Sequence, residues 1–425
     1  MSTSPLVVRP LVSTEEYYAY YFHLADAAFS HQPSEESTQS WMHFLTHSPD
    51  FRAEQLRGVF RDGQLLGGCM LHERVLRMGA AHISTGCIGA VVTDQNYRKQ
   101  GVATALMQDT YDFARSNNHA LLLLDGIPKF YGRYGYIDMF DVTAVEVDRS
   151  AILAQPPAGY GIRPATMDDA ADMLTLYNEH YGGYSGSFDR SLELQTYRLR
   201  HTQRPPVVAF SPWGQVAGYL LCGAGDEVVT GREIAANNWD ALLALLQYHA
   251  HLFDDDNAPR TLFYRLPLNA PMTQWMIDAL EVPDTTQWRT PPEEWGVRSM
   301  AYHHRFTGWM GRLINFPALM AAVLPELQVR WQGSMARWSG DIMLSVDGET
   351  CMLRIDGADV QITEHTGATT VYHLELTAQD LVQGIFGYRQ LSRLANVSHL
   401  PDDARSALSI LFPLGHTWIP GTDWF

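Results

Sequence analysis

Two stretches of the sequence begin alike, 154 residues apart. Val8-Arg9-Pro10-Leu11 precedes an acidic, aromatic helical pattern, and Ile162-Arg163-Pro164-Ala165 precedes another. Each pattern predicts a short strand, a turn and a helix with acidic residues in its first turn, where the helix dipole favours them. A repeat of this length indicates a duplicated domain and not a solenoid. The segment Gln155-Pro156-Pro157-Ala158-Gly159 is typical of a domain boundary.

Strand and helix patterns alternate after each opening helix, which predicts an α/β sheet in both copies. In the first copy Asp62-Gly63 predicts a hairpin turn between two strands. The expected elements there are strands at 57–61, 65–76 and 88–93, a helix at 101–117 and a buried strand at 120–124. Those of the second copy are strands at 207–210, 215–221 and 226–229 and a helix at 239–253.

The last third of the chain is richer in strands and predicts a separate α+β domain of about 120 residues. Asp347-Gly348 and Asp356-Gly357 mark two hairpins. We expect helices at 312–324, 378–384 and 402–412, and strands at 328–331, 340–346 and 371–376. The predicted domains are therefore residues 1–150, 151–300 and 301–425.

Composition excludes several classes of protein. The net charge of −17 lacks the basic footprint that nucleic acids and anionic membranes require, so we expect neither as a partner. No apolar run approaches the length of a membrane span, and no secretory signal is visible, so a cytoplasmic location is expected. The four cysteines are scattered, and His43 and His47 lack the glutamate of a zinc-protease motif. We predict no metal.

The stretch from Gly89 to Ala103 carries the clearest functional signal. An apolar strand runs into a polar turn, and a helix opens at Gly101. Free N–H groups at a helix start, together with the helix dipole, form an anion site. Arg98 and Lys99 add positive charge, so a pyrophosphate fits there. The pattern is neither a dinucleotide-binding G-x-G-x-x-G nor a P-loop.

The pattern Arg-x-x-Gly-x-Ala, at residues 98–103, resembles the coenzyme A motif of the GNAT superfamily of N-acetyltransferases. A second stretch, 126–136, resembles that family's turn of an aromatic pair followed by Gly-x-x-Gly-aromatic. A GNAT domain, a degenerate repeat and a strand-rich final domain together resemble the enhanced intracellular survival (Eis) family. The final domain's stretches 354–357 and 407–413 are similar to parts of sterol-carrier-like folds.

The resemblance implies tandem GNAT folds, each a mixed sheet flanked by helices, followed by a sterol-carrier-like α+β domain. It implies acetyl-CoA as co-substrate, a small-molecule or peptide amine as acceptor, and a homo-oligomer, specifically a hexamer. The second repeat lacks the motif in its turn at 229–234, so we expect it to be inactive. The residues implied to bind the cofactor are Val91, Val92, Thr93, Arg98, Lys99, Gln100, Gly101, Val102 and Ala103.

Two residues match the family's catalytic groups. Tyr131 matches the tyrosine that acts as general acid, although it could also only pack in its aromatic turn. Phe425 matches a C-terminal phenylalanine whose carboxylate acts as general base; an ordinary α-carboxyl is a weak base unless desolvated. A hydrophobic chain end packed on its own domain is the alternative interpretation.

The amine pocket departs from the family pattern. Phe29 and Trp41 match two aromatic positions, but His31 replaces an acid, Met42 an arginine and Trp424 another acid. Polycationic aminoglycosides need carboxylates, so we expect a more apolar amine. The predicted pocket residues are Asp26, Phe29, His31, Trp41, Asp125 and Trp424.

The first functional hypothesis is an acetyl-CoA-dependent amine N-acetyltransferase. The alternative is a lipid or small-ligand carrier whose GNAT domain is vestigial, suggested by the sterol-carrier-like final domain. Transfer of longer acyl groups is a third possibility. The sequence leaves the natural amine, the acyl length and any ligand of the final domain open.

Overall fold

The computed structural model describes residues 4–29, 34–202, 204–253, 258–280, 296–302, 308–363, 371–415 and 417–423. Contacts divide the chain into two compact units. The first unit contains residues 1–140 and 304–415, and the second contains 141–303 and 416–424. Each unit is therefore built from separate stretches of sequence.

The first unit is organised on a seven-stranded sheet in the order β1-β2-β3-β4-β5-β14-β6. β4 and β5 are parallel, and all the other neighbours are antiparallel. The strands are β1 (Val7–Pro10), β2 (Leu56–Arg61), β3 (Gln64–Met78), β4 (Ala81–Thr93), β5 (Leu121–Gly126), β14 (Gly308–Leu313) and β6 (Ile137–Asp138). The expected hairpin turn is present, with positive φ at both Asp62 and Gly63.

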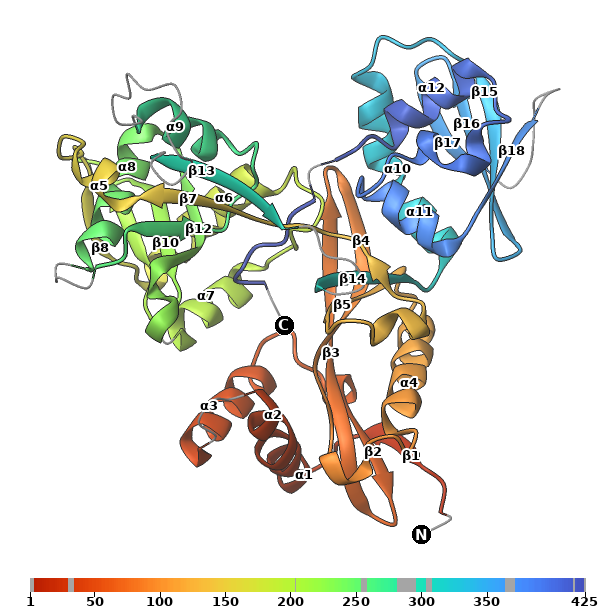
Figure 1. The fold of residues 1–425 in the computed structure, drawn as a ribbon, viewed down its shortest axis with the longest axis horizontal. Coiled ribbons are helices and arrows are strands. Elements are labelled where there is room, and N and C mark those ends of the chain that lie inside the picture. Colours follow the sequence, from red (N-terminus) through yellow and green to blue (C-terminus); the bar gives the residue numbers. More distant parts are fainter. Residues whose placement is uncertain are drawn as a thin grey trace. The chain divides into compact units, whose positions relative to one another are not determined.

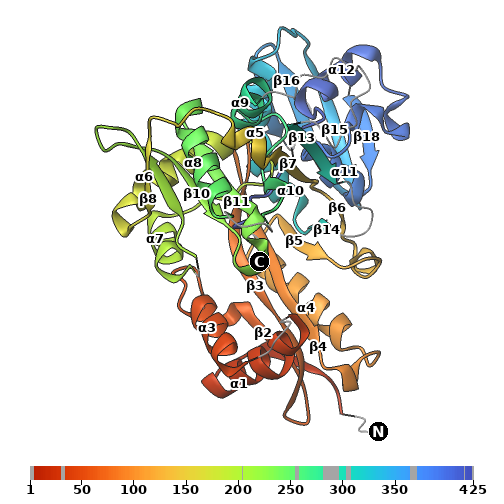
Figure 2. The same ribbon diagram turned by 60° about the vertical axis from the view of Figure 1, so that its left-hand side comes forward.

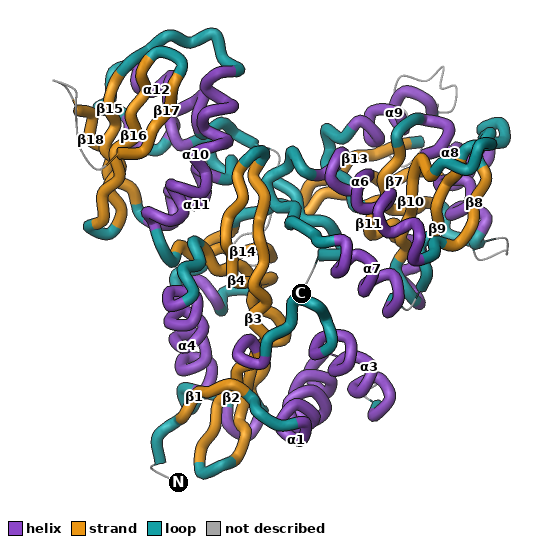
Figure 3. The backbone as a smooth tube through the Cα atoms, turned by 180° about the vertical axis from the view of Figure 1, so that it is seen from behind, coloured by secondary structure: helices purple, strands orange, loops and turns teal. Residues whose placement is uncertain are grey.

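Helices cover both faces of this sheet. The amphipathic helix α4 (Val102–Ser116) packs Leu106 and Met107 against one face. The other face buries Tyr20, Tyr21 and Leu24. Those residues lie on a π-helix (Ala19–Asp26), which follows α1 (Thr14–Tyr18) and leads into α2 (Ala27–Phe29). The helix α3 (Glu35–Thr46) packs beside the π-helix. Figures 1 and 3 show α4 and α1–α3 on opposite sides of β3 and β4.

The second unit has a seven-stranded sheet in the order β8-β9-β10-β11-β12-β7-β13. β11 and β12 are parallel and the rest antiparallel, so the pattern of directions repeats that of the first sheet. Its strands are β8 (Gly161–Pro164), β9 (Val207–Phe210), β10 (Val216–Cys222), β11 (Thr230–Ala236), β12 (Thr261–Tyr264), β7 (Val142–Asp148) and β13 (Val297–Tyr302). Its helices are α5 (Arg149–Leu153), α6 (Ala170–Tyr181), α7 (Leu192–His201), α8 (Trp239–His251) and α9 (Pro271–Ala279).

Each large sheet takes its sixth strand from a segment that lies outside its own repeat in the sequence. β7 precedes the second repeat in sequence, yet it pairs with β12 and β13 in the second sheet. β14 follows that repeat, yet it pairs with β5 and β6 in the first sheet. The units therefore do not follow the expected boundaries at residues 150 and 300. Local sequence could not reveal this, because strand pairing over such separations leaves no local signal.

A four-stranded sheet, β17-β16-β15-β18, follows β14 (Figure 2). Its strands are β15 (Gly340–Val346), β16 (Glu349–Asp356), β17 (Asp359–Thr363) and β18 (Val371–Leu376), and its helices are α10 (Phe316–Gln332), α11 (Ala378–Ile385) and α12 (Asp402–Leu411). α10 also contacts the first sheet, because Glu326 accepts a hydrogen bond of 2.8 Å from the Ala80 amide. Mixed sheets flanked by helices confirm the expected α/β class.

Two expected strands are wrong. Residues 328–331 form the last turns of α10, which continues through Pro325 and buries Leu327 and Trp331. Residues 226–229 lie in a 3₁₀ turn, and β11 begins after it. The segment 229–234, interpreted from sequence as the counterpart of the phosphate turn, is thus mostly strand. Stretches of four residues are too short to separate strand from helix without tertiary context.

Candidate active site

The centre of the first sheet opens where β4 parts from β5. The two strands pair from Thr85–Leu121 to Ile88–Leu124, and no further pairing of β4 with β5 is present in the described chain. On its other edge β4 continues to pair with β3 up to Thr93, with a bulge opposite Gly68–Met70. Residues 89–93 therefore have one edge turned away from β5. Such an edge offers backbone N–H and C=O groups to an extended ligand.

A strained residue sits at this opening. Ala90 has φ of +49°, which is unfavourable for a residue with a Cβ atom. The Tyr20 hydroxyl of the π-helix donates a 2.5 Å hydrogen bond to the Ala90 carbonyl. No sequence pattern pointed to either residue. A long π-helix is often found in a functional region, but no sequence pattern predicted one here.

The turn after β4 leads to an uncapped helix start. Asp94 caps a short 3₁₀ turn, Lys99 has φ of +63°, and Gly101 has φ of +86°. Gly101 is the N-cap residue of α4 and supplies no side chain, and α4 has no acidic residue in its first turn. The first intrahelical bond of α4 runs from the Ala105 amide to the Gly101 carbonyl, at 2.9 Å. The preceding amides are thus directed at an incoming anion.

The predicted cofactor-binding residues lie at the end of β4 and in the turn that leads into α4. Val91, Val92 and Thr93 end β4, while Arg98, Lys99, Gln100 and Gly101 are exposed in the turn. Gln100 accepts a 2.8 Å hydrogen bond from Arg61, which adds another cation to the turn. Val102 is buried under the turn, and Ala103 is half-buried.

Tyr131 opens the 3₁₀ turn Tyr131–Tyr134 and is 6% exposed. Its ring packs edge-on against Phe130 at 4.9 Å and Tyr136 at 6.0 Å. Gly126 at the end of β5 permits this approach, since a Cβ there would lie 3.2 Å from the Tyr131 ring. Burial raises the pKa of Tyr131 above its usual range, so the hydroxyl keeps its proton.

Of the predicted amine-pocket residues, the structure brings two together. The Phe29 and Trp41 rings lie 6.4 Å apart at 85°, and Trp41 also contacts Tyr21 at 5.4 Å. The Tyr21 hydroxyl is buried without a hydrogen-bond partner among the described residues, so it is a polar group that sequence reasoning missed. Asp125 is exposed on β5. His31, Trp424, Phe425 and the Asp26 side chain lie outside the described part of the chain.

The second sheet has a different helix start at the corresponding place. α8 is capped by Asn238, whose side chain accepts a 2.9 Å hydrogen bond from the Ala241 amide. Asp240 lies in the first turn. A carboxylate and an internal cap occupy the position that would attract an anion, so this helix start is unsuited to a phosphate.

Three further features of the described chain concern metal ligands, cysteines and membrane spans. No group of three or more His, Cys, Asp or Glu residues there could hold a metal ion. The four cysteines are buried and form no disulfide, and burial raises the pKa of Cys351 to about 11. No described helix is both long enough and apolar enough to cross a membrane.

Comparison with known proteins agrees with this geometry. Residues 9–137 match the family model of the acetyltransferase (GNAT) domain. No curated protein sequence matches the chain. Among solved structures, a protein of unknown function from Enterococcus faecalis V583, described as a probable N-acyltransferase, is similar over 100% of both chains, with 16% identity and a TM-score of 0.71.

Two further solved structures cover nearly the whole chain. A GCN5-related N-acetyltransferase from Kribbella flavida has 16% identity and a TM-score of 0.72, covering 100% of this chain and 99% of its own. Eis1 from Mycobacterium abscessus has 16% identity and a TM-score of 0.63, covering 99% and 100%. At this identity the likeness shows the fold alone. The match of residues 9–137 to the acetyltransferase (GNAT) domain supports acyltransferase activity of the chain.

Proposed function

We propose that the chain is an acetyl-CoA-dependent N-acetyltransferase that acetylates a primary amine of a small molecule or peptide by direct attack. The observation that carries the proposal is the uncapped, basic start of α4 beside the free edge of β4. Acetyl-CoA would supply the thioester acyl group. Residues 91–93 would hold the pantetheine arm through their backbone, and residues 98–103 would hold the phosphates.

Tyr131 is proposed as the general acid. A tyrosine hydroxyl is protonated at neutral pH, and burial raises the pKa of Tyr131 further, so the proton is present for donation to a departing thiolate. The Phe425 carboxylate is proposed as the general base that takes a proton from the amine. A carboxylate has an ordinary pKa of about 3.5 and needs desolvation to act as a base at neutral pH.

The amine pocket is proposed to lie around Phe29 and Trp41, with Asp26, His31, Asp125 and Trp424 contributing. Aromatic rings and few carboxylates favour an amine with an apolar body over a polycationic aminoglycoside. We further propose that residues 151–300 are mainly a degenerate GNAT repeat, supported by the shared strand order of the two sheets. The sterol-carrier-like identity of the final domain, the hexamer and the cytoplasmic location remain predictions.

A thiol-release assay with acetyl-CoA and a panel of amines tests the reaction. Tyr131→Phe should lower kcat by about 100-fold, the scale of general acid catalysis. The matched control is Tyr372→Phe on β18, which should leave kcat unchanged. One residue added after Phe425 should also lower kcat sharply, whereas one added before Met1 should not.

The alternative carrier function gives a different result in the same assay. No thiol release with any amine, together with a lipid that co-purifies with the chain, would favour a carrier with a vestigial acetyltransferase domain. Thiol release with longer acyl-CoA donors, at kcat/KM above that for acetyl-CoA, would change the proposed donor and keep the reaction class.

A further inference from the structure

The C-terminal segment 417–423 is built into the second unit. The Trp418 amide donates a 2.8 Å hydrogen bond to the Ser185 carbonyl, and the Trp418 ring stacks on Tyr181 at 4.6 Å. Trp418 is 2% exposed. Gly186 is needed there, because a Cβ would lie 2.3 Å from the Trp418 carbonyl oxygen. This segment is therefore part of the core and not a loose end.

The segment lies where the second sheet opens. β11 and β12 pair only at Thr230–Phe263 and Gly231–Tyr264, so the rest of β11 has a free edge in the described chain. Arg232 on β11 donates a 2.7 Å hydrogen bond to the Gly421 carbonyl. A Cβ at Gly421 would lie 2.9 Å from the Arg232 carbonyl and 3.5 Å from the side chain of Arg265, directly after β12. Residues 421–423 thus occupy the gap between the two strands.

The equivalent gap of the first sheet is the proposed acetyl-CoA site. In both sheets a tyrosine on a helix donates a hydrogen bond to a backbone carbonyl of the fourth strand. The acceptor lies beyond the last residue that pairs with the fifth strand. These bonds run from Tyr20 to Ala90 in the first sheet and from Tyr181 to Ile234 in the second. In the second unit the gap between the fourth and fifth strands is therefore filled by the chain itself. In the first unit the same gap leaves backbone groups available to a ligand.

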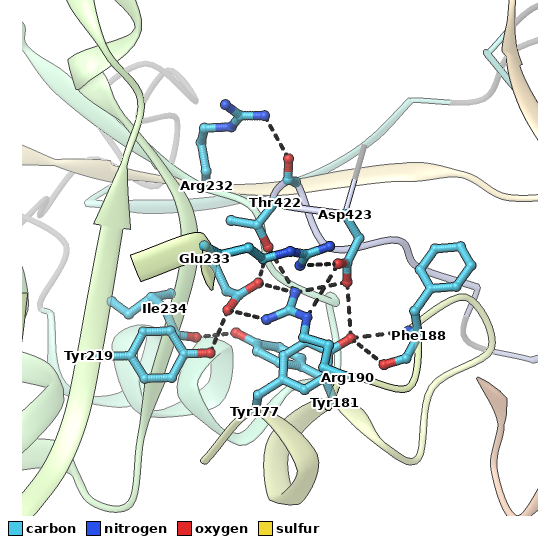
Figure 4. Close-up of polar contacts among 12 residues, drawn as sticks. Tyr177, Tyr181, Phe188, Arg190, Tyr219, Arg232, Glu233, Ile234, Thr422 and Asp423 are labelled. Carbon is cyan, nitrogen blue, oxygen red and sulfur yellow. Dashed lines mark hydrogen bonds and ion pairs between the residues drawn. The ribbon is translucent and has the colours of Figure 1, made fainter. Parts of the chain in front are cut away.

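A buried charge cluster holds the segment in the gap (Figure 4). Asp423 is fully buried and accepts hydrogen bonds from Arg190 at 2.8 and 3.2 Å, from Arg198 at 2.7 Å and from Tyr177 at 3.0 Å. Arg190 also makes a two-pronged ion pair with Glu233 on β11, at 2.7 and 2.9 Å. Every charge in the cluster has an opposite partner, which a buried charge requires.

Arg190 is the centre of this cluster. Its side chain is 2% exposed, and its guanidinium lies 3.5 Å from the centre of the Tyr177 ring. Although burial opposes its charge, the two carboxylates keep its pKa well above the usual value. Arg190 therefore stays charged and links β11 to the segment. Thr422 adds hydrogen bonds to Arg190 and Glu233.

We infer that Arg190 is a positioning residue: by holding Asp423 in the gap of the second sheet, it fixes where the last two residues of the chain can lie. Two residues span at most about 7 Å of extended chain, so the anchored Asp423 sets the reach of Phe425. The expected effect of Arg190 on catalysis rests on the proposed function. Its expected effect on the position of segment 417–423 rests on the charge cluster alone.

Asp423→Asn tests the inference, because it keeps the size of the side chain and removes the charge that Arg190 and Arg198 hold. Two quantities are measured: the rate at which a carboxypeptidase releases Phe425, and kcat with the KM for acetyl-CoA. We expect release at least about tenfold faster and kcat at least about tenfold lower, with the KM changed less than twofold. Asp402→Asn, at an exposed surface ion pair, is the matched control and should change neither.

The outcomes separate this inference from the proposed function. Unchanged release of Phe425 in Asp423→Asn would overturn the anchoring. Faster release with unchanged kcat would overturn the positioning role. Native protein without thiol release would refute the proposed function, while the release rates would still report on the anchor. If Asp423→Asn does not fold, Arg198→Gln removes one partly exposed partner of Asp423 and should give smaller changes in the same directions.

Discussion

The two seven-stranded sheets share an order of strands, but the gap between the fourth and fifth strands is open in the first sheet and filled in the second. In the first sheet, β4 parts from β5 next to an uncapped helix start with glycine as its N-cap. In the second sheet, the gap holds residues 421–423, and α8 begins with its own Asn238 cap and an acidic first turn. The comparison shows that the same gap in two sheets of like strand order can be left open or filled by the chain itself.

The largest expected effect comes from giving the first sheet an acidic helix start. Gly101→Asp places a carboxylate where the phosphates should bind, and we expect the KM for acetyl-CoA to rise by about 100-fold. Gly214→Asp is the matched control, because Gly214 has φ of +85° and open space around it. Both variants carry similar backbone strain. An equal effect of both on the KM would contradict the role of the helix start.

Each unit contains a buried histidine whose pKa is well below its usual value, which makes stability depend on pH. Burial lowers the pKa of His119 in the first unit and of His249 in the second to about 4. The unfolded chain takes up a proton near pH 6.5, and the folded chain does not until about pH 4. Stability contributed by each histidine is therefore intact above pH 6.5 and falls by about 2 kcal/mol between pH 7 and pH 5.

Thermal unfolding at pH 7 and pH 5 checks this expectation. His119→Gln and His249→Gln should each remove part of the pH dependence. If both buried-site variants kept the native pH dependence, carboxylates and not these histidines would control acid unfolding.

The matched tyrosines test whether the shared hydrogen bond serves stability or function. Tyr20→Phe and Tyr181→Phe each remove one donor to a carbonyl of the fourth strand, so each should lower the free energy of unfolding by about 1 kcal/mol. Only Tyr20→Phe should also lower kcat/KM for acetyl-CoA, by several-fold, because Ala90 lies beside the proposed acyl site. An equal loss of kcat/KM in both variants would contradict a specific role of the Tyr20 hydrogen bond at the proposed acyl site.

Sequence predicted the features of this molecule that are local. The motif at 98–103, the hairpin at Asp62-Gly63 and the repeated strand–turn–helix starts are short patterns with a direct physical meaning. It could not predict the exchange of β7 and β14, or the pairing of Arg190 with Asp423 across 233 residues. Those depend on packing between distant segments. In the sequence, the expectation that the second repeat is inactive rests on the turn at 229–234, which is mostly strand in the structure. The expectation therefore depends on Asn238 and on residues 421–423.

The smallest expected effect tests that expectation directly. Asn238→Gly opens the start of α8 and should lower the free energy of unfolding by only a few tenths of a kcal/mol, because glycine is itself tolerated as an N-cap. It should not create a second acetyl-CoA site, since Asp240 remains in the first turn and residues 421–423 still occupy the gap. Calorimetric titration should therefore give one acetyl-CoA per chain in both the native protein and the variant. A second binding event in the variant would mean that the cap alone closes the site, and that the segment in the gap leaves room for a ligand.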